Sequence, residues 1–250
     1  MERVIAETEK TVLGIFDDET AGEYFATDAS IASIARINLN KLLRYITKLT
    51  QANAVKMSER MVGGLDRQSK VGLKSSLKKI SEAMELKGGI DLPDVRDAFT
   101  ASVNVNVDLI KTMTGDYVSA VRGAVNRSIQ RGGGLESLIP DIEKFLKKEA
   151  LKTRNKAKNV ALDQTRKAYS ALNSARMRRM NLQEFEWVHS GGGQRPRELH
   201  KIPYPDGLNG GIFSLDDPPV IDEKTGERGI PGQLPNCECT MRPIVRFDEG

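Results

Sequence analysis

The chain has 250 residues, enough to bury a hydrophobic core in one large or two small domains. Only 5% of the residues are aromatic while 29% are charged, a composition that favours a helical protein over a sandwich of aromatic-rich strands. The net charge is +4, but acidic residues dominate before Asp28 and basic residues dominate from Asp141 to Met180, which suggests charged partners. No run of apolar residues approaches the length of a membrane-spanning helix, so no membrane span is expected.

Apolar residues at helical spacing predict three helices in the N-terminal part of the chain. Residues 1–16 form the first. Asp28-Ala29-Ser30 offers the side chains of a helix N-cap, and a second helix begins at Ile31. Gly63-Gly64 is expected to stop that helix, because glycine is favoured just beyond a helix end. A third helix covers residues 68–86 and ends before a second glycine pair.

The segment SVNVNVD (residues 102–108) fits two patterns. Its valines alternate as in a strand, but its first and third valines also begin a helical period that continues to Val125. A strand rarely runs that long, so length favours a helix, which the glycines at 132–134 are expected to end. An amphipathic helix over residues 138–146 then leads into a basic helix.

The basic helix is predicted from Asn159 to Met180. Small apolar residues recur there at spacings of three, four and seven, so one narrow face is available for close packing. The basic side chains are expected to stay solvated, either as an ordinary solvated face or as a site for nucleic-acid phosphates. The candidate DNA-binding residues are Arg166, Lys167, Arg176, Arg178 and Arg179.

Helical periodicity disappears after the basic helix, where most of the prolines lie. Strands are predicted near residues 184–189, 212–215 and 239–247, and together they would form a small sheet. The loop 222–232 (DEKTGERGIPG) is polar and glycine-rich and is expected to be mobile. The predicted fold class is therefore α+β: a long helical N-terminal part, followed by a small domain with the basic helix packed on a short antiparallel sheet.

His200, Cys237 and Cys239 are the candidate metal ligands, because imidazole and thiolates suit Zn²⁺. A tetrahedral site needs a fourth ligand, for which His189, Asp206 or a water are candidates. Against zinc, the cysteines are closer in sequence than the usual Cys-x₂₋₄-Cys spacing, and paired cysteines near a strand also serve as small buried hydrophobic residues. Packing is the favoured interpretation, so no cofactor is called for, and zinc is the alternative.

Arg195 and Arg197 either bind a phosphate or carboxylate group or brace the turn at Asp216-Asp217, and the brace is favoured. Trp187 lies on an alternating strand and is expected in the core. The chain carries no nucleophile-elbow, zinc-protease, Walker or dinucleotide-binding motif. Acidic residues do not converge in sequence near His200, as a metal nuclease would need, so an enzyme is not expected.

The order and spacing of the motifs from Asn159 onward resemble one family, the head-morphogenesis or minor head proteins of tailed phages, typified by the Mu F-like proteins. That family has a helix with RDQT or RTET, a Trp-bearing strand, D-x-R-x-R-x-x-H, G-x-x-F, a DPP turn and a closing N-C-R-C strand. The chain departs from it where Gly193 or Gln194 replaces an Asp, Glu238 replaces the Arg between the cysteines, and Asn181 replaces a helix-ending Gly. The residues at family positions are Asp163, Gln164, Thr165, Trp187, Arg195, Arg197, His200, Gly211, Phe213, Pro218, Pro219, Asn236, Cys237 and Cys239.

The resemblance implies a minor head protein that acts in head assembly and in genome packaging or delivery by binding. Its expected partners are the portal protein and a major capsid or scaffold protein, with double-stranded DNA as a further candidate. It implies few copies in the capsid interior of the virion, after assembly in the host cytoplasm.

Three regions are expected: a helical docking region at residues 1–90, a helical connector at residues 91–150, and a Mu F-like head-morphogenesis domain at residues 151–250. Long apolar stripes make the first region the natural surface for partners. The alternative function is a metal-dependent or nucleic-acid-processing enzyme that uses His200 with Cys237 and Cys239.

Overall fold

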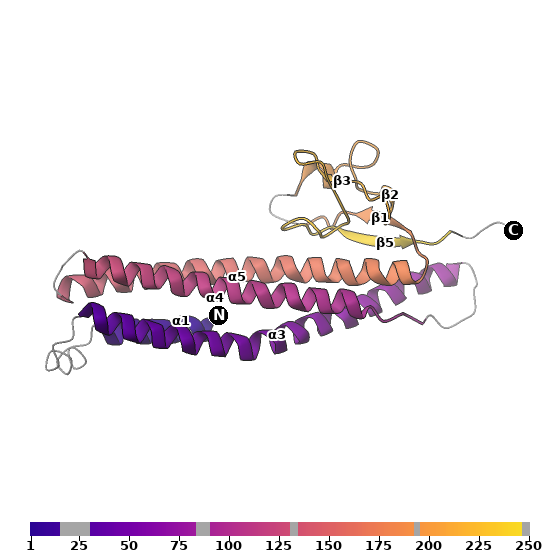
Figure 1. The fold of residues 1–250 in the computed structure, drawn as a ribbon. Helices are drawn as coiled ribbons and strands as arrows, with labels where there is room; N and C mark the ends of the chain where they lie inside the picture. The colour runs from indigo at the N-terminus through magenta and orange to yellow at the C-terminus, as the bar shows by residue number, and fades with distance from the viewer. Residues whose placement is uncertain (16–30, 84–90, 131–134, 193–195, 247–250) are drawn as a thin grey trace. The chain divides into compact units, whose positions relative to one another are not determined.

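The computed structural model describes residues 1–15, 31–83, 91–130, 135–192 and 196–246. Four helices come first: α1 (Glu2–Ile15), α3 (Ile31–Ala83), α4 (Arg96–Gln130) and α5 (Leu135–Arg179). The short helix α6 (Glu198–Lys201) and five strands follow, so the α+β fold class is confirmed (Figure 1). Among the described helices, none combines the length and apolar character that crossing a membrane requires.

Helix α3 runs through Gly63-Gly64, so the prediction that this pair ends a helix is wrong. Glycine in a helix interior costs about 1 kcal/mol relative to alanine. Burial on both sides offsets that cost, because Val62 and Leu65 are buried next to the pair. The two helices predicted on either side of the glycines are therefore one helix. The predicted N-cap at residues 28–30 lies outside the described residues.

The SVNVNVD segment is helical, as its length predicted, and lies near the start of α4. Val103 and Val107 are buried, whereas Val105 between them is exposed. A strand would have placed all three on one face, so helical geometry explains the difference. Helix α4 ends at Gln130, and the glycines at 132–134 lie outside the described residues.

The predicted amphipathic and basic helices are one continuous helix, α5. Its end has the geometry of a Schellman motif: the backbone N–H of Leu182 donates to the Met177 carbonyl at 2.9 Å, and the N–H of Asn181 donates to the Arg178 carbonyl at 3.1 Å. Asn181 itself has φ 57°. Asparagine tolerates this left-handed conformation, so it takes the place of the glycine usual in the family.

The chain forms two compact units, each assembled from two separated segments. The first combines residues 1–57 with residues 106–159, and the second combines residues 58–105 with residues 160–250. This division differs from the expected linear boundaries at residues 90 and 150. The core of the first unit contains Val4, Ile5, Val12, Leu39, Leu42, Ile46, Tyr117, Val121, Ile142 and Leu146. The core of the second contains Leu73, Leu77, Met177, Phe185, Trp187, Leu208, Leu215, Ile221, Leu234, Cys237, Cys239 and Met241.

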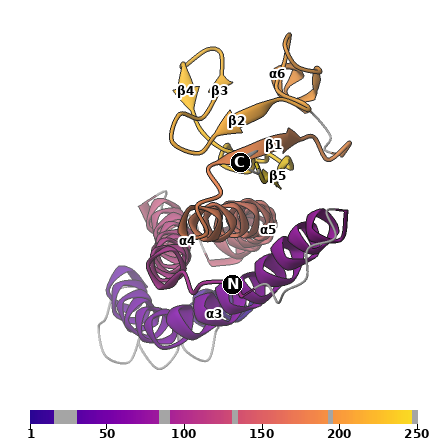
Figure 2. The same ribbon diagram turned by 90° about the vertical axis from the view of Figure 1, so that its right-hand side faces the viewer.

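The predicted sheet is present in the second unit. It consists of β1 (Glu184–Val188), β2 (Ile212–Ser214) and β5 (Thr240–Ile244), antiparallel in the order β2-β1-β5. Phe185 pairs with Phe213 on one side and with Pro243 on the other. In Figure 2 this sheet lies beside the end of α5 that belongs to the same unit.

Part of the loop predicted over residues 222–232 belongs to a small hairpin. Strands β3 (Val220–Asp222) and β4 (Glu227–Arg228) pair antiparallel around a turn with Gly226 at φ 70°. Ile221, at the centre of β3, is buried in the core of the second unit. Its burial anchors the strand that leads into the predicted loop.

Alanine at Gly64 should stabilise the second unit by about 1 kcal/mol, because Gly64 is helical and a Cβ there meets no atom within 4 Å. Urea unfolding followed by the fluorescence of Trp187, the single tryptophan, measures this change. Gly226→Ala is the matched control: its Cβ also meets open space, but φ is 70°. It should destabilise by about 1–2 kcal/mol. Loss of stability in Gly64→Ala would contradict the continuous helix.

Candidate functional site

His200, Cys237 and Cys239 converge in the core of the second unit. Helix α6 carries His200, and both cysteines lie on the segment that leads into β5. All three side chains are buried, His200 to 3% exposure. Trp187 of β1 is fully buried against the imidazole, with ring centroids 4.9 Å apart at 69°. The prediction that Trp187 belongs to the core is therefore confirmed.

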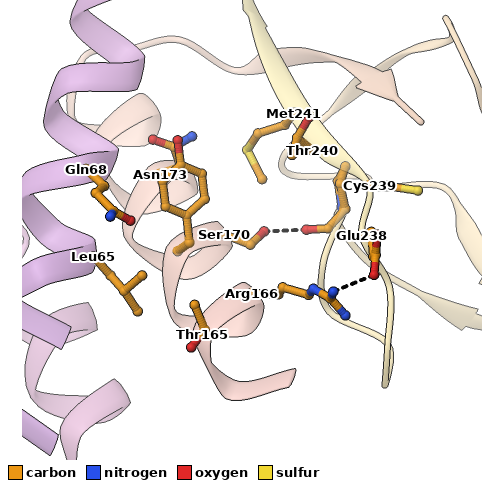
Figure 3. Close-up of a pocket in the computed structure, with 12 residues that line it drawn as sticks. Leu65, Gln68, Thr165, Arg166, Ser170, Asn173, Glu238, Cys239, Thr240 and Met241 are labelled. Atoms are coloured by element: carbon orange, nitrogen blue, oxygen red, sulfur yellow. Dashed lines mark hydrogen bonds and ion pairs between the residues drawn. The ribbon is translucent and has the colours of Figure 1, made fainter. Parts of the chain in front are cut away.

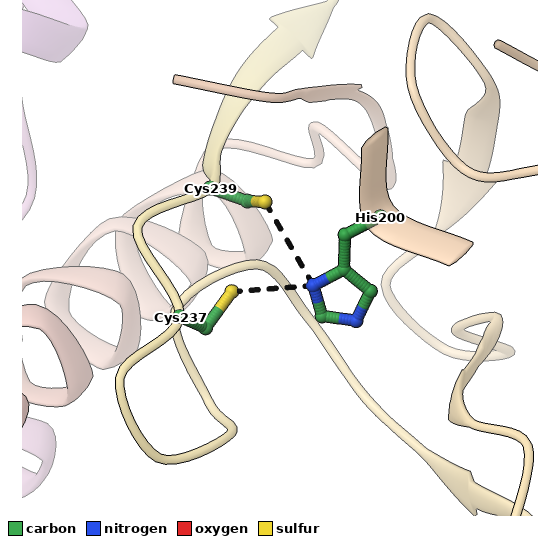
Figure 4. Close-up of side chains that lie close together, drawn as sticks. All are labelled: His200, Cys237 and Cys239. Carbon is green, nitrogen blue, oxygen red and sulfur yellow. Dashed lines mark hydrogen bonds between the residues drawn. The ribbon is translucent and has the colours of Figure 1, made fainter. Parts of the chain in front are cut away.

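Both sulfur atoms face one nitrogen of the imidazole (Figure 4). The Sγ of Cys237 lies 3.5 Å from Nδ1 of His200, and the Sγ of Cys239 lies 3.8 Å from it. Nε2, the other ring nitrogen, lies 2.9 Å from the backbone carbonyl of Ile221. A carbonyl only accepts, so Nε2 carries a proton, and in the neutral ring Nδ1 presents its lone pair to the two sulfurs.

The two thiols are electrostatically unequal. A hydrogen bond from Cys239 is the largest cause that lowers the pKa of Cys237, and contacts with His200 and two backbone groups act in the same direction against burial. The pKa of Cys239 is raised, first by the hydrogen bond to Cys237 and then by its own burial.

Two family-motif residues fix the segment that carries the cysteines to α5. The backbone N–H of Asn236 donates to the Asp163 carboxylate at 2.9 Å, and Lys167 pairs with the other oxygen of that carboxylate, also at 2.9 Å. Asn236 has φ 58°, a left-handed conformation that asparagine tolerates. Nearby, the hydroxyl of Ser170 donates to the Pro231 carbonyl.

A cavity of about 200 Å³ lies between α3, α5 and the cysteine segment (Figure 3). Its lining includes Leu65, Tyr169 and Met241 among the apolar residues. Arg166 and Glu238 also line it, and their side chains form an ion pair at 2.5 Å. Glu238 stands where the family has an arginine, and Arg166 supplies the complementary charge that this change calls for.

The five candidate DNA-binding residues all have partners within the protein. Arg166 pairs with Glu238, Lys167 with Asp163, Arg176 with Asp66 and Arg178 with Asp216, while Arg179 donates to the Asp94 carbonyl at 2.7 Å. DNA contact by this set requires exchange of those partners for phosphates. The expectation that all five are solvated is wrong for Arg176, which is completely buried.

The predicted brace of the Asp216-Asp217 turn comes from other arginines. Arg178 pairs with Asp216, and Arg228 pairs with Asp217 at 2.6 Å. Arg197 instead donates to the Pro235 carbonyl at 3.2 Å, so the partner predicted for it is wrong, and Arg195 lies outside the described residues. Arg197 therefore supports the cysteine segment.

Three further motif residues, Phe213, Pro218 and Pro219, pack within the second unit. Phe213 contacts Phe185 and Tyr204, with ring centroids 6.1 and 5.8 Å apart. Pro219 is buried and Pro218 half-buried, beside the β3–β4 hairpin. Gln164 is half-buried on α5.

A buried polar network joins α3 to α5 in the second unit. The guanidinium of Arg176 pairs with Asp66 and donates to the Ser69 hydroxyl at 2.5 Å. That hydroxyl in turn donates to Asn173 at 2.9 Å. Sequence reasoning missed this network, since its partners are more than a hundred residues apart and each resembles a surface residue.

Asp66→Ala should destabilise the second unit by about 3 kcal/mol or more, because it leaves the charge of Arg176 buried without a partner. Trp187 fluorescence in urea reports the change. Adding Arg176→Met to Asp66→Ala should restore part of the loss by removing the orphaned charge. Lys70→Ala is the matched control, because Lys70 is an outer partner of Asp66 at 3.2 Å and its loss should cost at most about 1 kcal/mol. Equal losses in Asp66→Ala and Lys70→Ala would refute the buried role of Arg176.

Comparison with known proteins gives one family and one relative. Residues 119–242 match the family described as "Phage Mu protein F like protein". The match begins in α4 and ends in β5, so it includes Asp163, His200 and both cysteines.

A protein of Haemophilus influenzae named "Uncharacterized protein" is 26% identical over 239 residues, which are 91% of this chain and 48% of the relative. The chain therefore spans about half the length of that relative. No solved structure matches the chain.

Proposed function

Residues 119–242 belong to the Phage Mu protein F like family, and on this basis we propose that the protein is a minor head protein of a tailed phage. It takes part in head assembly and in genome packaging or delivery by binding other head components. The family match is the observation that carries this proposal, since it covers every described motif residue from Asp163 to Cys239.

The roles of the motif residues support binding over catalysis. Asp163 and Asn236 hold the cysteine segment on α5, Arg197 supports the same segment, and Trp187 fills the core. These contacts give the motif residues structural roles within the second unit. His200, the general base that the enzymatic alternative requires, is buried at 3% exposure. We therefore infer that the motif residues stabilise the fold of the second unit.

The long helices offer surface for protein partners. Large apolar side chains are exposed on them, including Met57 at 56% and Val71 at 70% on α3 and Leu151 at 60% on α5. An exposed apolar side chain in the middle of a long helix is a natural contact for a partner helix. The portal protein and the major capsid or scaffold protein are the proposed partners, and the capsid interior is the proposed location, with few copies per particle.

Double-stranded DNA is a weaker candidate partner. The cations first considered for it are occupied by Glu238, Asp163, Asp66, Asp216 and the Asp94 carbonyl. Net DNA affinity falls when each phosphate contact has to displace an existing ion pair. A role through protein contacts agrees better with this arrangement of charges.

The variant Met57→Asp/Val71→Asp should lower incorporation into heads at least tenfold, because it places charges on the exposed apolar positions of α3. Heads are purified from cells in which the variant replaces the native gene, and copies per portal are counted by quantitative mass spectrometry. Ser75→Asp, at an exposed polar position of the same helix, adds a charge without removing apolar surface and should enter normally.

Two results would overturn parts of this proposal. Wild-type copy number in the doubly substituted heads places the docking surface elsewhere on the protein. Absence of the wild-type chain from purified heads rejects the minor head role itself.

A further inference from the structure

We propose that His200, Cys237 and Cys239 bind one Zn²⁺ ion that is part of the folded second unit. This inference concerns the stability of the unit and is independent of the role in head assembly. The spacing of the cysteines in sequence favoured simple packing. Three features of the folded site favour a metal instead.

The first feature is the placement of the ligand atoms. Nδ1 of His200 and the two Sγ atoms all lie within 4.8 Å of one another, and the nitrogen-to-sulfur distances are 3.5 and 3.8 Å. Zinc bonds of about 2.05 Å to nitrogen and 2.3 Å to sulfur at a tetrahedral angle place these atoms about 3.6 Å apart. The two nitrogen-to-sulfur distances therefore match the separation that one zinc ion requires.

The second feature is the orientation of the imidazole. Nε2 donates to the Ile221 carbonyl at 2.9 Å, which fixes the ring and leaves the lone pair of Nδ1 toward the sulfurs. Histidine ligands in zinc sites almost always donate their other ring N–H to a carbonyl or carboxylate, because this sets the tautomer. Trp187 packs edge-on against the ring and restricts its rotation.

The third feature is the number of acceptors. Both sulfur atoms approach the same nitrogen, Nδ1 of His200, and its single lone pair accepts one well-aligned hydrogen bond, so this nitrogen satisfies only one of two thiols. A cation between the sulfurs and Nδ1 satisfies all three ligands at once.

The protein supplies three ligands to this ion from the part of the chain that the structure describes. His189 and Asp206, expected as possible fourth ligands, are not in the cluster, and Nδ1 of His189 accepts a hydrogen bond from the Gly191 N–H at 3.0 Å. A water completes the tetrahedron. Nitrogen and thiolate ligands select zinc over magnesium or calcium.

The test is zinc content of the full chain, expressed without a histidine tag in zinc-supplemented medium and measured by mass spectrometry of the metal. About one zinc per chain is expected. Cys239→Ala and His200→Ala should each retain less than about a tenth of it, because two ligands hold zinc weakly. Met241→Ala is the matched control: it empties space in the same core, removes no ligand and should keep its zinc.

Cobalt substitution keeps the proposal falsifiable if a ligand variant fails to fold. The wild-type chain, stripped of zinc and titrated with Co²⁺, should develop a thiolate-to-cobalt charge-transfer absorption that saturates at one equivalent. A wild-type chain that purifies with less than about a tenth of an equivalent of zinc, and gives no such absorption, overturns the site.

Chelation provides the link to folding. Removing zinc should lower the melting temperature of the wild-type chain and leave that of Cys237→Ala unchanged, since metal-binding energy is part of folding energy. In a double-mutant cycle, His200→Ala and Cys237→Ala should be strongly non-additive with zinc and nearly additive after chelation. Additive effects both with zinc and after chelation would show that the cysteines are packing residues. Neither outcome bears on incorporation into heads, so the two proposals fail separately.

Discussion

The segment that carries the cysteines is held on α5 by a hydrogen bond from the Asn236 backbone N–H to the Asp163 carboxylate. Asp163 lies on the first turns of α5 that belong to this unit, and Asn236 directly precedes the cysteines. The bond holds a segment without regular structure against a helix, and therefore sets where Cys237 and Cys239 enter the core. Once they are placed, β5 can pair with β1 and the sheet is complete. The Asp163 motif on α5 and the Asn236 motif before the cysteines, far apart in sequence, are therefore in direct contact.

The buried charge of Arg176 plays a complementary part at the other face of α5. A guanidinium with no exposed surface is tolerated only where oxygen atoms surround it, and α3 supplies Asp66 and Ser69. Such a network contributes less to net stability than to correct placement, because displacement of either helix along the other would leave a charge unpaired. The network joins α3 to α5 through Asp66, Ser69 and Asn173.

Periodic features of the sequence were sufficient to predict most of the fold. Helices α1, α4 and α5 and strands β1, β2 and β5 follow from apolar spacing, since burial of one face is what that spacing reflects. The helix end predicted at Gly63-Gly64 was wrong because the low helix propensity of glycine is a weak effect. Burial of the neighbouring Val62 and Leu65 outweighs it. The β3–β4 hairpin was not predicted because one buried residue, Ile221, anchors it. A single apolar residue produces no periodic pattern in the sequence.

The candidate site was predictable in composition but not in geometry. His200 and the cysteines were recognised as ligand types, whereas the carbonyl of Ile221 that orients the imidazole leaves no trace in side-chain sequence. The ion-pair partners of Arg166 and Arg176 could not be predicted either, because the sequence does not distinguish a solvated arginine from one that is paired within the protein. Long-range ion pairs become visible only when the topology brings α3 and the cysteine segment to α5.

The interleaving of the two units imposes an order on biosynthesis. Leu73 and Leu77 belong to the core of the second unit, but most of that core is encoded after residue 176 and its last strand ends at Ile244. At about 5–20 residues per second, the ribosome needs roughly ten to thirty seconds between completing α3 and completing β5. During that interval the first unit can close, while the apolar face of α3 that awaits the second is open to water. A nascent chain with such a face is a substrate for chaperones, and the cysteines are among the last residues of this core to be synthesised.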